Sequence, residues 1–172
     1  MTNAYIMIGL PGSGKTNWVL NRFGLYQNCN VFSLNLLRYQ FAVRKIPDLP
    51  VLNLRKEPSA KQYMAIWDLC KSQGQMFGRM TDQAMKARLQ EIRRGYPLFI
   101  DNMNLYAPKR EQLIQRCREF GANVVGVFLD TQLETCIERQ QKTRGISREQ
   151  MEQMYINMDI PGKPEFDEFI VV

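Results

Sequence analysis

Histidine is absent from this chain of 172 residues, and its absence narrows the chemistry that the chain can perform. Without an imidazole, a group that takes a proton near neutral pH must be a carboxylate, a lysine, a tyrosine, a cysteine or water. Cysteine is scarce, and no two of the four cysteines form a C-x-x-C pair. We therefore expect reduced thiols, typical of a cytoplasmic protein, rather than zinc ligands or a disulfide framework.

Long apolar runs are also missing. The best candidates, Tyr5–Leu10 and Val124–Leu129, have the length of strands, so we expect no membrane-spanning helix. The sequence enters a strand directly, with no signal-peptide pattern, which predicts a cytoplasmic location, or the host cytoplasm if the chain is viral. Repeats, linkers and low-complexity tracts are absent as well. A single domain over residues 1–172 is the expected organisation.

What the chain does contain is an ordinary globular composition with an excess of positive charge. Hydrophobic residues make up 45% and charged residues 23%, which excludes a disordered chain. The formal net charge is +6, which favours phosphate-rich partners and gives nucleic acid a modest advantage among them.

Short apolar strands alternate with helical segments along the sequence. Such alternation predicts an α/β fold with a parallel sheet covered on both faces. The expected strands are 5–8, 29–32, 98–101, 124–129 and 169–172. The expected helices are 15–23 stopped by Gly24, 36–41, 59–70 capped by Ser59, 81–94 stopped by Gly95, and 108–120 stopped by Gly121. Residues 45–57 read as a loop, and two capping boxes, Thr131 with Glu134 and Ser147 with Gln150, predict two further helices.

A phosphate-binding loop follows the first strand. The segment Gly9-Leu10-Pro11-Gly12-Ser13-Gly14-Lys15-Thr16 matches G-x-x-x-x-G-K-[ST] at every fixed position and lies between a strand and a helix. The glycines let backbone N–H groups approach a phosphate, and the N-terminus of the next helix adds to the attraction. Lys15 can reach the β- and γ-phosphates, and the Thr16 hydroxyl can ligate Mg²⁺. The motif predicts binding of a Mg²⁺–nucleoside triphosphate, with ATP as the expected nucleotide.

Two further groups of residues fit such a site. Asp101 ends a buried strand, where it can ligate Mg²⁺ directly or indirectly and touch Thr16; a carboxylate that only caps the next loop is the alternative. Around Gly145, four cations suggest a mobile lid over the triphosphate, with Arg144 as its main arginine, although a solvated helix end would also collect cations. These cations are Arg139, Lys142, Arg144 and Arg148.

With these motifs in place, the chain resembles the kinase domain of bacteriophage polynucleotide kinase and related phage kinases of hydroxymethyluracil in DNA. The resemblance covers nearly the whole chain and rests on segments 8–16 with Trp18, 99–105, 143–145 and 166–172. It implies a three-layer P-loop kinase fold with a helical lid, and ATP- and Mg²⁺-dependent phosphorylation of a hydroxyl on DNA. It further implies that Arg144 acts on the triphosphate and that Arg38 contacts a phosphate of the acceptor.

Two departures from this family concern the acceptor. Asn35 lies where the family has the aspartate that acts as general base, and an amide can orient a hydroxyl but cannot take its proton. Asn102-Met103-Asn104 replaces the family's Asp-Thr-Asn, with Asp101 one residue earlier. Asn35 could merely orient the acceptor, Asp101 could supply the base, the acceptor could differ from a DNA 5′ end, or the asparagine could be a deliberate substitution.

Three function classes therefore stay open at the level of sequence. The first is a kinase for a DNA hydroxyl, at a 5′ end or on the hydroxymethyl group of 5-hydroxymethyluracil. The second is a kinase for a free nucleoside or another small metabolite. The third is a nucleotide-binding protein without transfer activity.

Overall fold

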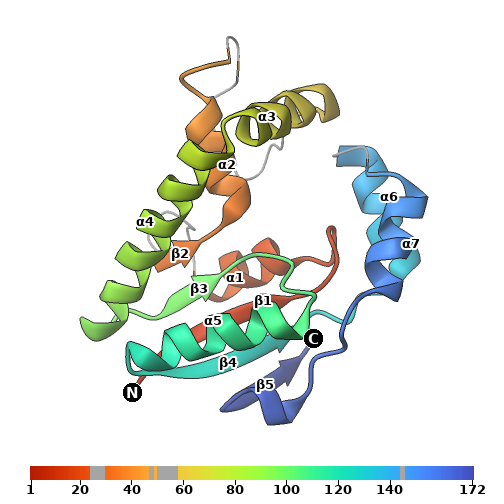
Figure 1. Cartoon of the computed structure of the whole chain (residues 1–172). Coiled ribbons are helices and arrows are strands. Elements are labelled where there is room, and N and C mark those ends of the chain that lie inside the picture. Colours follow the sequence, from red (N-terminus) through yellow and green to blue (C-terminus); the bar gives the residue numbers. More distant parts are fainter. Residues whose placement is uncertain (24–29, 47–48, 50–57, 144–145) are drawn as a thin grey trace.

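The described chain alternates strands and helices, as the sequence predicts. The computed structural model describes residues 1–23, 30–46, 49, 58–143 and 146–172. Gly24, Cys29, Arg144, Gly145 and most of the expected loop 45–57 lie outside the described residues. The elements in chain order are β1 (Thr2–Ile8), α1 (Lys15–Phe23), β2 (Asn30–Phe32), α2 (Leu34–Ala42), α3 (Ala60–Ser72), α4 (Gly74–Arg93), β3 (Leu98–Ile100), α5 (Ala107–Glu119), β4 (Ala122–Phe128), α6 (Leu133–Thr143), α7 (Arg148–Ile156), the 3₁₀ turn η2 (Lys163–Glu165) and β5 (Glu168–Val171) (Figure 1).

The strands form one parallel sheet in the order β2-β3-β1-β4-β5. In the centre, Ala4 of β1 lies opposite Leu98 of β3 on one side and Val124 of β4 on the other. Every neighbouring pair is parallel, so all the carboxyl ends meet at one edge. Open α/β sheets bind their ligands at this edge, and the phosphate-binding loop follows β1 there.

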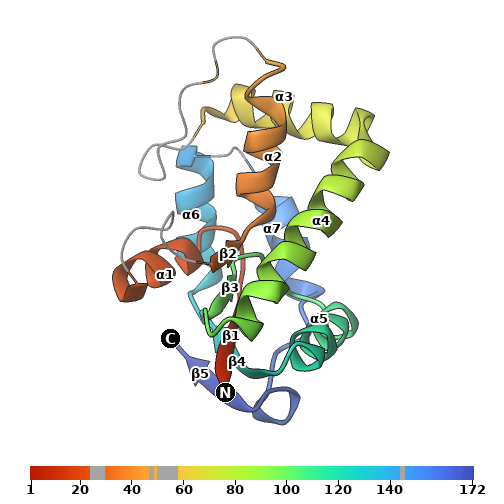
Figure 2. The ribbon, with the colours of Figure 1, turned by 90° about the vertical axis from the view of Figure 1, so that its left-hand side faces the viewer.

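Helices cover both faces of the sheet, which gives the three layers that were expected. Ile6 and Ile8 point to the face covered by α4 and α5, where they join a core that includes Leu89 and Ile114. Met7, between them, points to the other face and packs with Val19 of α1, as the two-residue period of a strand requires. Figure 2 shows α1 and α5 on opposite sides of the sheet. Within the described residues, no helix combines the length and apolarity needed to cross a bilayer.

Two helical pairs lie beyond the carboxyl edge of the sheet. On the side of β2 and β3, α2 and α3 share a small core that includes Phe41 and Ile66. On the side of β4, α6 and α7 share another that includes Ile137 and Met151. Figures 1 and 2 both show these pairs past the ends of the strands. The site is therefore flanked by one helical pair on each side.

The helix expected from Thr81 begins earlier than predicted, at Gly74. Glycine weakens a helix, but α4 runs through Gly74 and Gly78 because its first turns pack Phe77 and Met80 against the core that α2 and α3 share. The Thr81 hydroxyl donates to the Gly78 carbonyl oxygen at 2.7 Å, a back-bond that a helix interior tolerates. The prediction of the helix end is confirmed, since Gly95 has a φ of +89°.

One of the two predicted capping boxes is confirmed and the other is wrong. Ser147 with Gln150 forms a complete capping box, and Ser59 caps α3 with Gln62. The box predicted from Thr131 and Glu134 is wrong, because α6 begins at Leu133 and its first turn closes on the Gln132 oxygen. The Thr131 hydroxyl donates to the Ser13 carbonyl oxygen at 2.9 Å. Thr131 instead joins the start of α6 to the phosphate-binding loop.

Candidate active site

The loop after β1 is tightly wrapped, and its glycines permit the backbone conformation that this requires. Gly9, Gly12 and Gly14 have φ values of +148°, +82° and +98°, which strain any other L-residue. A Cβ on Gly12 would lie 2.9 Å from the Cys136 carbonyl oxygen, closer than real contacts permit. Leu10 and Pro11, between the glycines, are buried and anchor the loop. Ser13 is buried with its backbone nitrogen bonded to the Leu10 oxygen at 3.2 Å.

The Lys15 ammonium lies inside this loop. Its Nζ donates to the carbonyl oxygens of Gly9 and Leu10, at 3.0 and 2.6 Å, and to Ser13 Oγ at 3.3 Å. The side chain is largely buried although it carries a charge. Burial of an ammonium is costly, and the three oxygens that accept from Nζ offset this cost. The loop therefore holds a positive charge.

Thr16 and Asp101 meet at the carboxyl edge of the sheet. The Thr16 hydroxyl donates to Asp101 Oδ2 at 2.6 Å, and the carboxylate is 6% exposed. The Asp101 backbone nitrogen continues the sheet by bonding to the Phe32 oxygen at 2.9 Å. A hydroxyl and a carboxylate are hard oxygen ligands, and Mg²⁺ takes one or two such ligands together with phosphate oxygens and water. The donor set therefore fits Mg²⁺. Among the described residues, no group of three or more cysteine or acidic side chains could hold a metal by itself.

The asparagine-rich segment after Asp101 holds the loop in place, a role that sequence reasoning missed. Asn104 has a φ of +49° and donates from Nδ2 to the Met7 oxygen at 2.7 Å. The Met103 oxygen accepts from the Gly9 nitrogen at 3.1 Å. Asn102 Oδ1 accepts from the Leu34 nitrogen at 2.9 Å, which ties the start of α2 to the end of β3. An asparagine just after a strand was the available signal, because its side chain tolerates a left-handed backbone.

Arg110 is a second contributor that the sequence did not reveal. Its side chain is fully buried in α5, and its Nε and Nη2 bind both carboxylate oxygens of Glu165 at 2.8 and 2.9 Å. Its Nη1 donates to the oxygens of Asn104, Leu105 and Asp159, at distances between 2.9 and 3.1 Å. This single guanidinium joins the segment after β3 to the chain before β5. An arginine in a helical stretch gives no sequence signal for such burial.

The expected lid cations fall into different places. Arg139 Nη1 donates to the Gly12 oxygen at 2.9 Å, so α6 brings this guanidinium to the loop. Arg148 instead binds both carboxylate oxygens of Glu134 at 2.7 Å, and its hydrogen bond lowers the pKa of Glu134. Arg148 thus joins α7 to α6, and its expected part in a lid over the triphosphate stays a prediction. Lys142 is exposed on α6, and Arg144 lies outside the described residues.

The acceptor residues suggested by the resemblance lie at the start of α2. Asn35 Oδ1 accepts two hydrogen bonds, from Arg38 Nη1 at 3.1 Å and from the Tyr63 hydroxyl of α3 at 3.0 Å. Ser33 caps α2 through its contact with the Leu36 nitrogen. Leu34, the residue before Asn35, donates its backbone N–H to Asn102. This bond places the start of α2, with Asn35, beside the segment that carries Asp101. The structure thus brings these acceptor residues to the edge that carries Lys15 and Thr16.

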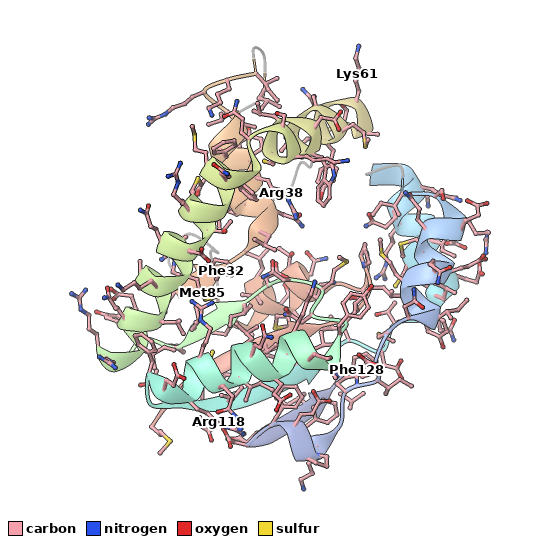
Figure 3. All side chains as sticks on the ribbon, viewed as in Figure 1. Phe32, Arg38, Lys61, Met85, Arg118 and Phe128 are labelled. Carbon is pink, nitrogen blue, oxygen red and sulfur yellow. The ribbon has the colours of Figure 1, made fainter. Side chains whose placement is uncertain are left out.

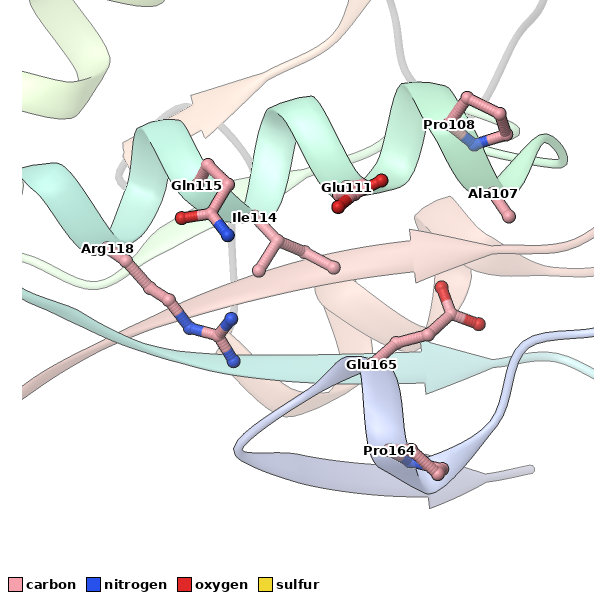
Figure 4. Close-up of a pocket in the computed structure, with 8 residues that line it drawn as sticks. All are labelled: Ala107, Pro108, Glu111, Ile114, Gln115, Arg118, Pro164 and Glu165. Carbon is pink, nitrogen blue, oxygen red and sulfur yellow. The ribbon is translucent and has the colours of Figure 1, made fainter.

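A groove of about 360 Å³ lies elsewhere, between α5 and η2 (Figure 4). Two of its charged side chains already have partners, because Arg118 pairs with Asp167 and Glu165 with Arg110. It contains none of the residues described above for phosphate or metal. Its lining residues are Ala107, Pro108, Glu111, Ile114, Gln115, Arg118, Pro164 and Glu165.

Known proteins share this architecture. Residues 5–155 match the model of a family described as an AAA domain, AAA_33. A candidate kinase from Chloroflexus aurantiacus superposes with a TM-score of 0.62 at 12% identity, over 99% of this chain and 87% of that one. Kti12 from Chaetomium thermophilum, solved in complex with ADP-AlF3, superposes with a TM-score of 0.52 at 14% identity, over 98% and 88% of the two chains. At these identities the likeness defines the fold, which is that of P-loop kinases.

Proposed function

The chain belongs to this family of AAA domains, and we propose that it is a phosphotransferase that binds Mg²⁺–ATP on residues 9–16 and transfers the γ-phosphate to a hydroxyl. One observation carries the proposal: Lys15, held inside a tightly wrapped glycine loop, begins the helix whose next residue, Thr16, contacts Asp101 at 2.6 Å. Kti12, which shares the fold, was solved with ADP-AlF3, and this complex supports the choice of nucleotide.

Each residue of this site has a distinct part in the proposal. Loop N–H groups and the start of α1 attract the phosphates, and Lys15 neutralises charge on the β- and γ-phosphates. Thr16 and Asp101 would hold Mg²⁺, which neutralises charge that develops during transfer. Arg139 already contacts the loop and can turn toward a bound phosphate. Arg144 is proposed as the lid arginine on the resemblance alone.

For the acceptor, we propose a hydroxyl on DNA, at a 5′ end or on the hydroxymethyl group of 5-hydroxymethyluracil. The resemblance to polynucleotide kinase, the net charge of +6 and the position of Arg38 support this choice. Asn35 is proposed to orient the acceptor hydroxyl. Transfer through a loose, metaphosphate-like transition state depends more on such positioning than on early removal of a proton.

The experiment is transfer of label from γ-labelled ATP to a panel of acceptors. The panel holds a 5′-hydroxyl oligonucleotide, the same oligonucleotide with a blocked 5′ end, duplex DNA containing hydroxymethyluracil, and free nucleosides. We expect label on DNA, and nuclease digestion locates it on a terminal sugar or on a base. Lys15→Ala should abolish transfer, and Lys86→Ala, an exposed lysine of α4, is the matched control.

Two outcomes contradict the proposal at different levels. Label found only on free nucleosides removes DNA as the acceptor but keeps the phosphotransferase. ATP that binds while its label never reaches any acceptor leaves a nucleotide-binding protein without transfer activity.

A further inference from the structure

An exposed tryptophan stands beside the acceptor residues. The ring of Trp67 on α3 is 43% exposed, and the Arg38 guanidinium lies over it with its carbon 4.2 Å from the ring centroid. Figure 3 shows Arg38 extending from α2 toward the side on which α6 and α7 lie. The other tryptophan, Trp18, has a different setting, since it packs with Tyr5 against the core between α1 and the sheet.

This tryptophan is connected to the proposed catalytic edge by a short series of contacts. Asp101 is followed by Asn102, whose Oδ1 accepts from the Leu34 nitrogen at the start of α2. Asn35, the next residue, accepts from Arg38 and from Tyr63, four residues before Trp67 on α3. Side chains four residues apart share one face of a helix. Trp67 and Arg38 therefore lie on the same side of the α2–α3 pair as Asn35.

The chemistry of the pair fits a nucleotide. An indole offers a flat apolar surface for a base, and base–aromatic stacking tolerates any base sequence. A guanidinium can stack on the same ring, and guanidinium groups pair with phosphates. The net charge of +6 favours an anionic occupant.

We propose that Trp67 and Arg38 form the acceptor-recognition surface and bind one nucleotide unit of the acceptor. Its base stacks on the Arg38–Trp67 pair, its phosphate pairs with Arg38, and its reacting hydroxyl lies toward Asn35. This inference rests on the proposed function, which already includes the contact of Arg38 with a phosphate and of Asn35 with the hydroxyl, and it adds that Trp67 recognises a base of the acceptor. The unit can belong to a single-stranded oligonucleotide or to a free nucleotide, and the experiment separates the two.

The test uses tryptophan fluorescence in a Trp18→Phe background, where Trp67 is the remaining tryptophan of the two in the chain. The probes are a 5′-hydroxyl thymidine octamer, an abasic octamer of equal length, and thymidine 3′-monophosphate. We expect the thymidine octamer to quench the emission and to bind about tenfold more tightly than the abasic octamer. Monophosphate binding as tight as that of the octamer identifies a free nucleotide as the source.

Variants then assign the stacking to this ring. Trp67→Ala should weaken octamer binding about tenfold, measured by anisotropy of a 3′-labelled octamer, and Trp67→Phe should keep part of the affinity. Tyr96→Ala removes an aromatic ring that is 59% exposed, before β3 at the opposite edge of the sheet, and should leave binding unchanged. Circular dichroism of each variant establishes that it is folded.

Affinity for Mg²⁺–ATP, measured in the same variants, keeps the two proposals apart. Trp67→Ala should retain it. Equal binding of the abasic and thymidine octamers, or unchanged octamer affinity in both Trp67 variants, overturns the recognition surface and leaves the phosphotransferase intact. If the unsubstituted chain shows no binding of Mg²⁺–ATP, the proposed function itself is overturned.

Discussion

At the scale of single residues, Asn35 separates two views of the transfer reaction. Its Oδ1 accepts from Arg38 and Tyr63, at 3.1 and 3.0 Å, so the amide is held in one orientation beside Asp101's segment. A carboxylate at this position could accept the same two hydrogen bonds. The Arg38 guanidinium would favour its ionised form, which is the form that takes a proton.

We therefore expect Asn35→Asp to raise the rate of transfer to a 5′-hydroxyl oligonucleotide, by up to about 100-fold where proton removal limits the rate. Asn35→Ala, which loses both hydrogen bonds, should be slower than the unsubstituted chain. Single-turnover rates with γ-labelled ATP measure both effects. An Asn35→Asp rate equal to that of the unsubstituted chain contradicts this prediction and assigns Asn35 an orienting role only.

At the scale of elements, Arg110 is the buried group on which the packing behind the site depends most. Arg110→Met would remove five hydrogen bonds at once, two to the Glu165 carboxylate and three to the oxygens of Asn104, Leu105 and Asp159. Removing one partner of a fully buried ion pair costs about 3 kcal/mol or more in the free energy of unfolding, and because Glu165 is 26% exposed we expect a loss of about 2 kcal/mol. Urea unfolding followed by circular dichroism should show a loss of this size.

The matched control lies on the same helix. Arg118 also pairs with an acid near β5, Asp167 at 2.9 Å, but both side chains are more than a third exposed. Exposed ion pairs contribute about 1 kcal/mol or less, so Arg118→Met should change stability little. Equal losses of stability for Arg110→Met and Arg118→Met would show that the buried contacts of Arg110 do not contribute more than an exposed ion pair.

Asp167 gives the junction of β4 and β5 a dependence on pH. Hydrogen bonds from the Val124 nitrogen and from Arg118 lower the pKa of Asp167 below its ordinary value of 3.8. A carboxyl whose pKa is lowered by folding stabilises the fold above its ordinary pKa, and this contribution is lost as the pH falls through the lowered value.

Asp167→Asn should therefore reduce the melting temperature at neutral pH and flatten its decline below about pH 4. Calorimetric melting temperatures between neutral pH and about pH 2 measure this, with Asp68→Asn, an exposed residue of α3, as the control. An Asp167→Asn curve parallel to that of the unsubstituted chain would remove the assignment.

Local patterns predicted those elements that local forces determine. The apolar runs gave β3 and β4, and Ser147 with Gln150 gave the start of α7. The glycine motif gave the phosphate-binding loop between β1 and α1. Tertiary contacts decided the rest. Packing of Phe77 on the α2–α3 core extends α4 back to Gly74. The start of α6 at Leu133 places Thr131 outside the cap position, where its hydroxyl binds the Ser13 oxygen.

The site was predictable where a motif names its residues and not where partners come from afar. Thr16 and Asp101 are 85 positions apart, yet their contact follows from a motif and from the ends of parallel strands. The pairing of Arg148 with Glu134 was not predictable, because Glu134 lies on the preceding helix and helix packing alone brings the two together. The stacking of Arg38 on Trp67 likewise depends on how α3 packs against α2.

At the scale of the whole molecule, positive charge should govern affinity for nucleic acid. The net charge is +6, and each phosphate that a cation contacts releases a counterion. For single-stranded DNA, the logarithm of the affinity should fall with the logarithm of salt concentration by about 0.7 for each contacted phosphate. Titrations of a 5′-hydroxyl oligonucleotide at several salt concentrations give this slope.

Arg38→Gln should reduce the salt slope by about 0.7, the value for one phosphate contact, whereas Arg94→Gln, at the end of α4, should leave the slope unchanged. Oligonucleotide affinity that does not change with salt, or no measurable affinity at low salt, would remove DNA from the proposed acceptors.

The central claim is that residues 9–16 cradle the phosphates of ATP, and equilibrium binding of Mg²⁺–ATP tests it most directly. Isothermal titration calorimetry should show one binding event per chain for the unsubstituted protein and for Lys86→Ala. Lys15→Ala should lose affinity by at least about tenfold, because it removes the ammonium that lies within the loop and is proposed to neutralise the phosphates. No heat of binding with the unsubstituted protein, or equal affinity in Lys15→Ala, would contradict the account.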